Sequence, residues 1–189
     1  MKIIVWNSQD KCVADYHKLI RGCDVLCLLD CGQWTVPVYA LQIQNGLFHW
    51  KDEHEGLSYD IFYCLEKVAF ICRDGLYSGE SVLYSIHSNI GSLVGIRLQD
   101  DFWLFANHES NRSNACHIGE FYLREISDRF RKAAFVADFK EKSYSWAQET
   151  IGGLYCIAPP KGYHPHTINY LFTICLLYTS PSPRDGLLS

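Results

Sequence analysis

Four polar side chains stand directly after apolar runs that are predicted to form strands. These residues are Asn7, Asp30, His108 and Asp138. Loops at strand ends can present such groups to a ligand, and oxygen ligands of this kind suit Mg²⁺, which binds through one or two carboxylates plus substrate phosphate. A histidine opposite the metal could act as a general acid or base, or stabilise charge on the phosphate. Strand ends are also often polar simply because they are solvated. The residue types alone therefore do not distinguish a functional site from ordinary surface residues.

Apolar periodicity predicts the elements that must position these four residues. Residues 2–6 and 24–29 are expected to be strands, with a helix over residues 11–21 between them. Further strands are expected at residues 59–65, 67–72, 81–87, 93–98, 102–107, 133–137, 154–158 and 167–173, with a hairpin turn at 99–101. Apolar residues three or four apart predict a second helix over residues 114–131. Many strands with few helices predict one mixed α/β domain of stacked sheets, with helices on the outside.

Composition and charge narrow the function classes. The 189 residues are 48% hydrophobic, which is enough for one domain with a substantial core. No apolar run reaches the roughly 18 residues that a membrane span needs. The first residues do not resemble a signal peptide, so a cytoplasmic location is expected, or secretion if the start is miscalled. The net charge of -4 argues against a globally basic nucleic-acid binder, but not against an enzyme that engages one phosphate through a metal.

The cysteines are interpreted as buried thiols. There are nine, an odd number, and several of them lie inside apolar runs: Cys27, Cys64, Cys72 and Cys156. Cys23, Cys27 and Cys31 are spaced by four, which raises the alternative of a zinc site. Structural zinc sites prefer closely spaced cysteine pairs with a second pair downstream, and that pattern is missing, so buried or strand-end thiols are the favoured interpretation.

Five short motifs occur in one order along residues 3 to about 173. They are Trp6-Asn7; Leu28-Leu29-Asp30-Cys31-Gly32; Val94-Gly95-Ile96-Arg97 followed by Phe102 to His108; Ala137-Asp138-Phe139; and Ile168-Asn169-Tyr170. Together they resemble the endonuclease/exonuclease/phosphatase (DNase-I-like) superfamily, closest to the catalytic subunits of cytolethal distending toxins. The resemblance implies a four-layer α/β/β/α sandwich and Mg²⁺-dependent hydrolysis of phosphodiester bonds, with DNA as the expected substrate. It leaves the identity of any partner subunits open.

The resemblance also implies a role for each site residue. Asn7 and Asp30 would hold the metal, Asp138 would orient the attacking water, and His108 would protonate or stabilise the phosphoryl oxygens. Asn169 stands where the family has an aspartate that positions a second histidine. The substrate contacts would come from Arg112, Asn114 and Lys140.

Several departures from the family pattern predict impaired catalysis. Asp30 replaces a glutamate. Lys140 places an ammonium where an amide is expected, and this ammonium could occupy the cation site itself and so weaken Mg²⁺ binding. Asn114 and Asn169 replace aspartates, which removes two charges. Catalytic groups that act as a unit can lose most of their effect when one member is lost. Two alternatives therefore stand beside the DNase-like enzyme: a catalytically inactive pseudoenzyme that serves as a binding module, and a phosphatase acting on phosphoinositide-type esters.

The C-terminal residues are expected to be foreign to the domain. Residues 175–185 resemble a one-frame translation of the transposon-end adaptor used in sequencing libraries. The expected division is a DNase-I-like domain over residues 1–174, truncated at its C-terminus, and an adaptor-derived tail over residues 175–189. The family's closing Ser-Asp-His motif, with its second catalytic histidine, would then fall beyond the break.

Overall fold

A computed structural model describes the parts of the chain that carry the fold. The described residues are 1–7, 16–31, 36–53, 56–64, 67–86, 92–108, 117–118, 121–126, 129–130, 132–138, 155–157 and 169–173. For Asn7, Asp138 and all of residues 155–157 and 169–173, which include Asn169, the structure describes the backbone alone. No helix within these ranges is long and apolar enough to cross a membrane.

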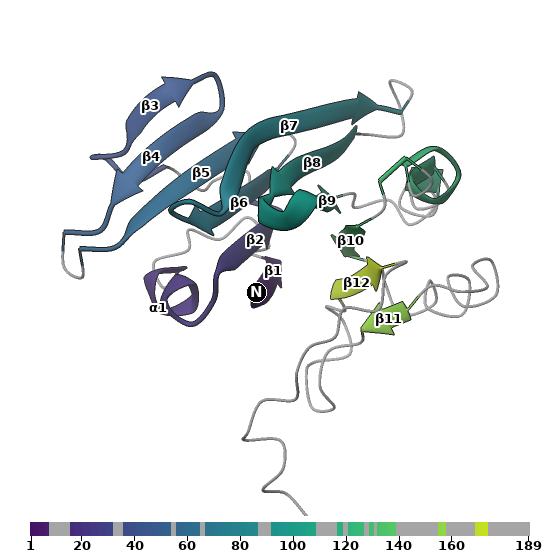
Figure 1. Ribbon diagram of the computed structural model, residues 1–189, viewed down its shortest axis with the longest axis horizontal. Helices are drawn as coiled ribbons and strands as arrows, with labels where there is room; N and C mark the ends of the chain where they lie inside the picture. Colours follow the sequence, from purple (N-terminus) through teal and green to yellow (C-terminus); the bar gives the residue numbers. More distant parts are fainter. Residues whose placement is uncertain are drawn as a thin grey trace, which may run out of the picture.

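The first sheet has six strands in the order β1-β2-β6-β5-β4-β3 (Figure 1). Their bounds are β1 Ile3–Asn7, β2 Val25–Leu29, β6 Val68–Arg73, β5 Ser58–Cys64, β4 Leu47–Lys51 and β3 Leu41–Gln44. β1 and β2 are parallel, and every other neighbouring pair is antiparallel. The helix α1 (Tyr16–Arg21) lies between β1 and β2 in the chain, and such a crossover is what a parallel strand pair requires.

The second sheet also has six strands, in the order β11-β12-β10-β9-β8-β7. Their bounds are β11 Tyr155–Ile157, β12 Asn169–Thr173, β10 Ala133–Asp138, β9 Phe102–Asn107, β8 Ser92–Leu98 and β7 Tyr77–Ser85. β9 and β10 are parallel, and the other pairs are antiparallel. A 3-10 turn over Gln99–Asp101 joins β8 to β9, and a π-helical segment, Tyr122–Ile126, lies between β9 and β10 in the chain.

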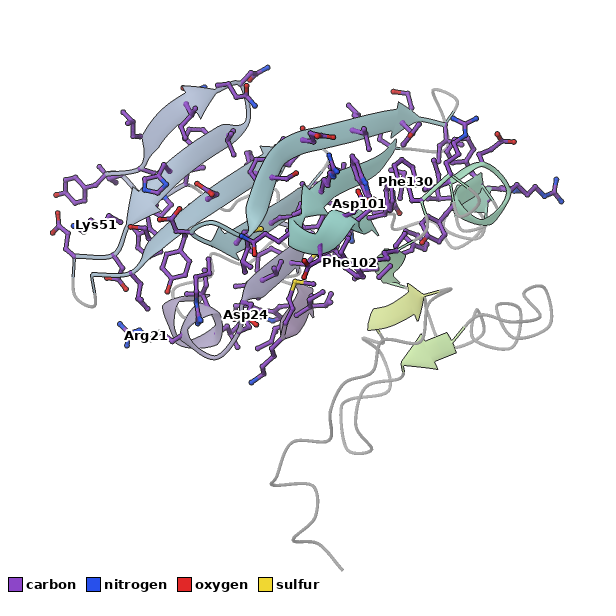
Figure 2. All side chains as sticks on the ribbon, viewed as in Figure 1. Arg21, Asp24, Lys51, Asp101, Phe102 and Phe130 are labelled. Carbon is purple, nitrogen blue, oxygen red and sulfur yellow. The ribbon has the colours of Figure 1, made fainter. Side chains whose placement is uncertain are left out.

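The two sheets pack face to face, and helical segments cover their outer faces. A buried cluster between the sheets takes side chains from both, among them Phe70 of β6 and Leu104 of β9. A second cluster joins Ile20 of α1 to the outer face of the first sheet. A third joins Tyr122 to the outer face of the second sheet, where Phe130 also packs (Figure 2). Apolar residues on both faces of β2 and β6 follow from this arrangement, because those strands are covered on each side.

Most of the predicted strands are confirmed, with ends shifted by a residue or two. β7 is longer than expected, because it begins at Tyr77 rather than at residue 81. The first predicted helix is helical from Tyr16, and residues 11–15 lie outside the described residues. Within residues 114–131, the described helical parts are residues 117–118 and 121–126.

The hairpin of β3 and β4 was missed, because no strand was predicted between residues 29 and 59. Asn45-Gly46 joins the two strands, and Gly46 has a φ of 75°. Asn-Gly between alternating apolar residues is a strong hairpin signal, because glycine readily adopts the positive φ that the turn needs. The alternation of Leu41 and Ile43 with glutamines was therefore a usable sign of a strand.

Gly95 of β8 offers a test of the packing between strands. A Cβ atom at this position would lie 2.6 Å from Cδ1 of Phe105 and 3.0 Å from Cγ2 of Val82. Gly95→Ala is therefore expected to lower the free energy of unfolding by about 1–3 kcal/mol, the usual cost of overpacking a core. Urea unfolding would measure it, with Gly22→Ala as the control, because a Cβ there meets only the Leu19 carbonyl oxygen at 3.5 Å. Equal stabilities for the two variants would contradict this packing.

Candidate functional site

Asp30 and His108 meet across the two sheets. Asp30 follows the last residue of β2, and His108 follows the last residue of β9. Nε2 of His108 lies 3.1 Å from Oδ1 of Asp30, and their side chains are 8% and 17% exposed. β2 also contacts β9 directly, so the pair is positioned by two packed strands rather than by long loops. The sheets thus bring an imidazole and a carboxylate together at one end of the sandwich.

Lys67 is the third ionisable residue of this group. Its Nζ lies 3.3 Å from Oδ1 of Asp30, the same oxygen that His108 contacts. Leu29 of β2 pairs with Val68 of β6, so Asp30 and Lys67 are the next two residues opposite each other beyond this pair. Asp30 and Lys67 both have a positive φ, of 53° and 63° respectively. The amide of Cys31 donates to the Lys67 carbonyl at 3.1 Å. Backbone geometry therefore places Lys67 beside Asp30.

His108 has one ring nitrogen facing Asp30 and one buried away from it. Nδ1 is buried, and it has no hydrogen-bond partner within the described part of the chain. The preceding residue, Asn107, is 3% exposed and donates from Nδ2 to the carbonyl oxygen of Ser92 at 2.6 Å. This hydrogen bond ties the end of β9 to the start of β8. Asn107 therefore supports the histidine, a role that the sequence pattern did not single out.

The other predicted residues are placed through backbone register. Asn7 pairs with Leu29, one residue before Asp30. Ala137 pairs with Asn107 in the parallel β9–β10 ladder, so Asp138 and His108 are the next residues along that ladder. Asp138 pairs with Asn169, and β1 contacts β12.

All five backbone positions thus lie at one end of the two sheets. The remaining predicted site residues, Arg112, Asn114 and Lys140, lie outside the described residues.

One described side chain at this end of the sandwich, Asp30, offers the kind of oxygen ligand that a hard divalent cation requires. Asp30 supplies a carboxylate that already attracts two basic groups to one oxygen, and the backbone of Asn7 lies one strand away. Oxygen ligands of this kind suit Mg²⁺. The ammonium of Lys67 competes for the same carboxylate oxygen, so an ion bound there has to displace it or share Asp30 with it.

A second group with metal-ligand chemistry lies elsewhere in the first sheet. His49 of β4, Asp60 of β5 and Asp74 each offer one ligand atom, and these atoms lie within 4.8 Å of one another. Nδ1 of His49 is 3.0 Å from Oδ1 of Asp60. This group could hold a metal ion. Sequence analysis missed it because its members are far apart in the chain, and because β4 was not recognised as a strand.

The cysteines behave as buried thiols where they are described. Cys23, Cys27, Cys31 and Cys72 are buried and form no disulfide. Burial raises the pKa of Cys23 to about 11 and the pKa values of Cys27 and Cys72 well above their usual range. The prediction of buried thiols is confirmed for Cys27 and Cys72, whereas the side chains of Cys64 and Cys156 lie outside the described residues. A raised thiol pKa opposes the thiolate form that zinc requires.

Comparison with known proteins gives one similarity in structure. No protein-family profile matches the chain, and no curated protein sequence matches it. Among solved structures, the chain is similar to the endonuclease domain of TRAS1, a telomere-specific non-LTR retrotransposon. The TM-score is 0.46 at 12% sequence identity, over 91% of this chain and 84% of that chain.

Proposed function

We propose that the chain is a DNase-I-like, Mg²⁺-dependent phosphodiesterase whose substrate is DNA. The observation that carries the proposal is the 3.1 Å contact between His108 and Asp30 across the two sheets. These are the two residues at which the motif resemblance puts the catalytic histidine and the metal-binding carboxylate. A sandwich of two sheets with helical segments on both outer faces is also the architecture that the resemblance implies.

In this proposal each residue has one task. Asp30 and Asn7 hold the cation, which when bound polarises the phosphate and stabilises the leaving oxygen. Asp138 orients the attacking water, and Asn169, its partner in the β10–β12 ladder, stands where the family has an aspartate that positions a second histidine. His108 uses Nε2, the nitrogen that faces Asp30, to donate a proton or a hydrogen bond to a phosphoryl oxygen. Arg112, Asn114 and Lys140 contact the substrate phosphates.

Nicking of supercoiled plasmid tests the proposal. The purified protein is expected to convert supercoiled DNA to the open circular form with Mg²⁺, slowly because of the departures at Asp30, Asn114, Lys140 and Asn169, and to stop when a chelator is added. Soluble inositol phosphates serve as the competing substrate class, and phosphate release from them is expected to be slower. Faster hydrolysis of the inositol phosphates than of plasmid DNA would instead favour a phosphatase acting on phosphoinositide-type esters.

The second candidate function is a binding module that keeps the fold without catalysis. The observation that favours it is Lys67, whose ammonium lies 3.3 Å from Asp30, where a cation would be bound. A lysine that holds this carboxylate permanently would leave no place for Mg²⁺. The protein would then bind its ligand through the site without hydrolysing it.

Lys67→Met separates the two candidates. In the enzyme, removing the competing ammonium is expected to tighten Mg²⁺ binding by a factor of about 1.4 to 5, since a partly exposed ion pair contributes roughly 0.2–1 kcal/mol. Calorimetric titration measures this change. Lys132→Met is the matched control, because Lys132 is exposed and contacts only the carbonyl oxygen of Asp100 among the interactions described. Mg²⁺ binding seen in Lys67→Met but not in the unsubstituted protein would instead support the binding module.

A further inference from the structure

His49 and Asp60 form a fixed pair on neighbouring strands of the first sheet. They are directly opposite in the β4–β5 ladder, and Nδ1 of His49 lies 3.0 Å from Oδ1 of Asp60. Their side chains are 35% and 17% exposed. Asp74 joins them from the turn after β6, where its amide donates to the carbonyl of Ser58 at 2.9 Å. The three ligand atoms, which come from three separate segments, lie within 4.8 Å of one another.

The pair lies on the face of the first sheet that is turned toward the second sheet. Tyr59 and Ile61 flank Asp60 in β5, and both belong to the outer cluster with α1. Because side chains alternate along a strand, Asp60 points to the opposite, inner face. Its partner in the β5–β6 ladder, Cys72, belongs to the cluster between the sheets. Asp60 is therefore a carboxylate at the margin of the apolar layer, where an uncompensated negative charge is costly.

The nearby arginine does not neutralise this group. Arg73 pairs with Tyr59 in the ladder, so it shares the outer face, and it binds Asp24 and the Cys23 carbonyl there. Lys51 lies at the end of β4 (Figure 2) and is exposed. Two carboxylates and one imidazole thus converge, and within the described part of the chain neither Asp60 nor Asp74 has an ion pair with a lysine or arginine. Asp74 is exposed and keeps one side of the group open to solvent.

We propose that His49, Asp60 and Asp74 bind a divalent transition-metal ion of the Zn²⁺ type. One imidazole nitrogen and two carboxylate oxygens are ligands that Zn²⁺ accepts, and water would complete the coordination. Imidazole favours such an ion over Mg²⁺ and Ca²⁺, which take oxygen ligands. The separation of 3.0 Å between the His49 and Asp60 ligand atoms suits two ligands about 2.0–2.2 Å from one ion.

This ion has a structural role that is separate from phosphodiester cleavage. Lys67, beside Asp30, precedes β6, and Asp74 follows it, so β6 separates the two groups by about 20 Å at the usual rise of a strand. That distance is too long for two metals to share one phosphate, since such pairs lie about 3.5–4 Å apart. The ion instead joins β4, β5 and the end of β6, toward the β3 edge of the sheet (Figure 1).

Zn²⁺ titration of the full chain, followed by calorimetry and thermal unfolding, tests the site. The unsubstituted protein is expected to bind one Zn²⁺ and to melt at a higher temperature when Zn²⁺ is present. Asp74→Asn is expected to weaken binding at least tenfold and to abolish the thermal shift, while plasmid nicking in Mg²⁺ is unchanged. His49→Gln is expected to do the same, and His117→Gln, at an exposed histidine outside the group, to bind as the unsubstituted protein does.

The absorption spectrum of bound Co²⁺ distinguishes this site from the thiols. Co²⁺ bound by one imidazole and carboxylates gives weak visible absorption without an intense sulfur-to-metal charge-transfer band in the near ultraviolet. Such a spectrum, lost in Asp74→Asn, supports the proposal. Equal Zn²⁺ affinity in the unsubstituted protein and Asp74→Asn, a strong charge-transfer band, or no Zn²⁺ binding at all would each overturn it. None of these outcomes bears on plasmid nicking, so the proposed phosphodiesterase is tested independently.

Discussion

His108→Gln is expected to lower the rate of Mg²⁺-dependent plasmid nicking by on the order of 10²–10⁴-fold, the range of a lost general acid or base. Gln retains an amide that can still donate to Oδ1 of Asp30, where Nε2 of His108 lies at 3.1 Å. It cannot transfer a proton at neutral pH. The loss is therefore expected in kcat, with Mg²⁺ affinity measured by calorimetry nearly unchanged.

His117→Gln is the matched control for this substitution. His117 is exposed and belongs to the segment between β9 and β10, so its replacement is expected to leave nicking within about twofold of the unsubstituted protein. Urea unfolding of His108→Gln checks that the end of β9 is intact. A folded His108→Gln protein that nicks DNA at the unsubstituted rate would remove His108 from the proposed chemistry.

Asp30→Asn is expected to remove Mg²⁺ binding at the site and to lower nicking by roughly 100-fold or more. The expected loss follows from the several kcal/mol that a metal ion contributes to charge stabilisation at a phosphoryl group. The substitution keeps the shape of the side chain but removes the charge that attracts both His108 and Lys67. Calorimetric Mg²⁺ titration and the nicking assay measure the two effects separately.

Asp101→Asn controls for the general loss of one negative charge. Asp101 is exposed and pairs with Arg97 at 2.9 Å in the turn between β8 and β9. Its substitution is expected to change neither Mg²⁺ affinity nor nicking. If Asp30→Asn retains the Mg²⁺ affinity of the unsubstituted protein, the ion is held elsewhere, and the role assigned to Asp30 is wrong.

The sequence predicts the framework of the site well, because apolar strands with polar ends are local features. The ends of β1, β2, β9 and β10 were each placed within about a residue from apolar runs alone. The local sequence, however, does not indicate which strand ends lie close together in the fold. The contact of Asp30 with His108 depends on β2 packing against β9, which are far apart in the chain.

The features that were missed depend on pairing between distant segments. Lys67 contacts Asp30 because β2 and β6 are neighbours in the sheet. A lysine at this point of the sequence does not by itself indicate that contact. The group of His49, Asp60 and Asp74 needs the registers of both the β4–β5 and β5–β6 pairs. The β3–β4 hairpin, by contrast, was predictable from Asn45-Gly46, and recognising it would have placed His49 on a strand.

Diffraction from crystals soaked in Mn²⁺, which can replace Mg²⁺ at oxygen ligands, tests the central claim most directly. The account predicts an anomalous peak within coordination distance of Asp30, beside Asn7 and the ring of His108, with the Lys67 ammonium moved off Oδ1 of Asp30. A peak confined to His49, Asp60 and Asp74 would show that the second group binds the ion and that the first does not. A fully occupied Mn²⁺ site elsewhere, with Lys67 still paired to Asp30, would contradict a metal-dependent phosphodiesterase at this site.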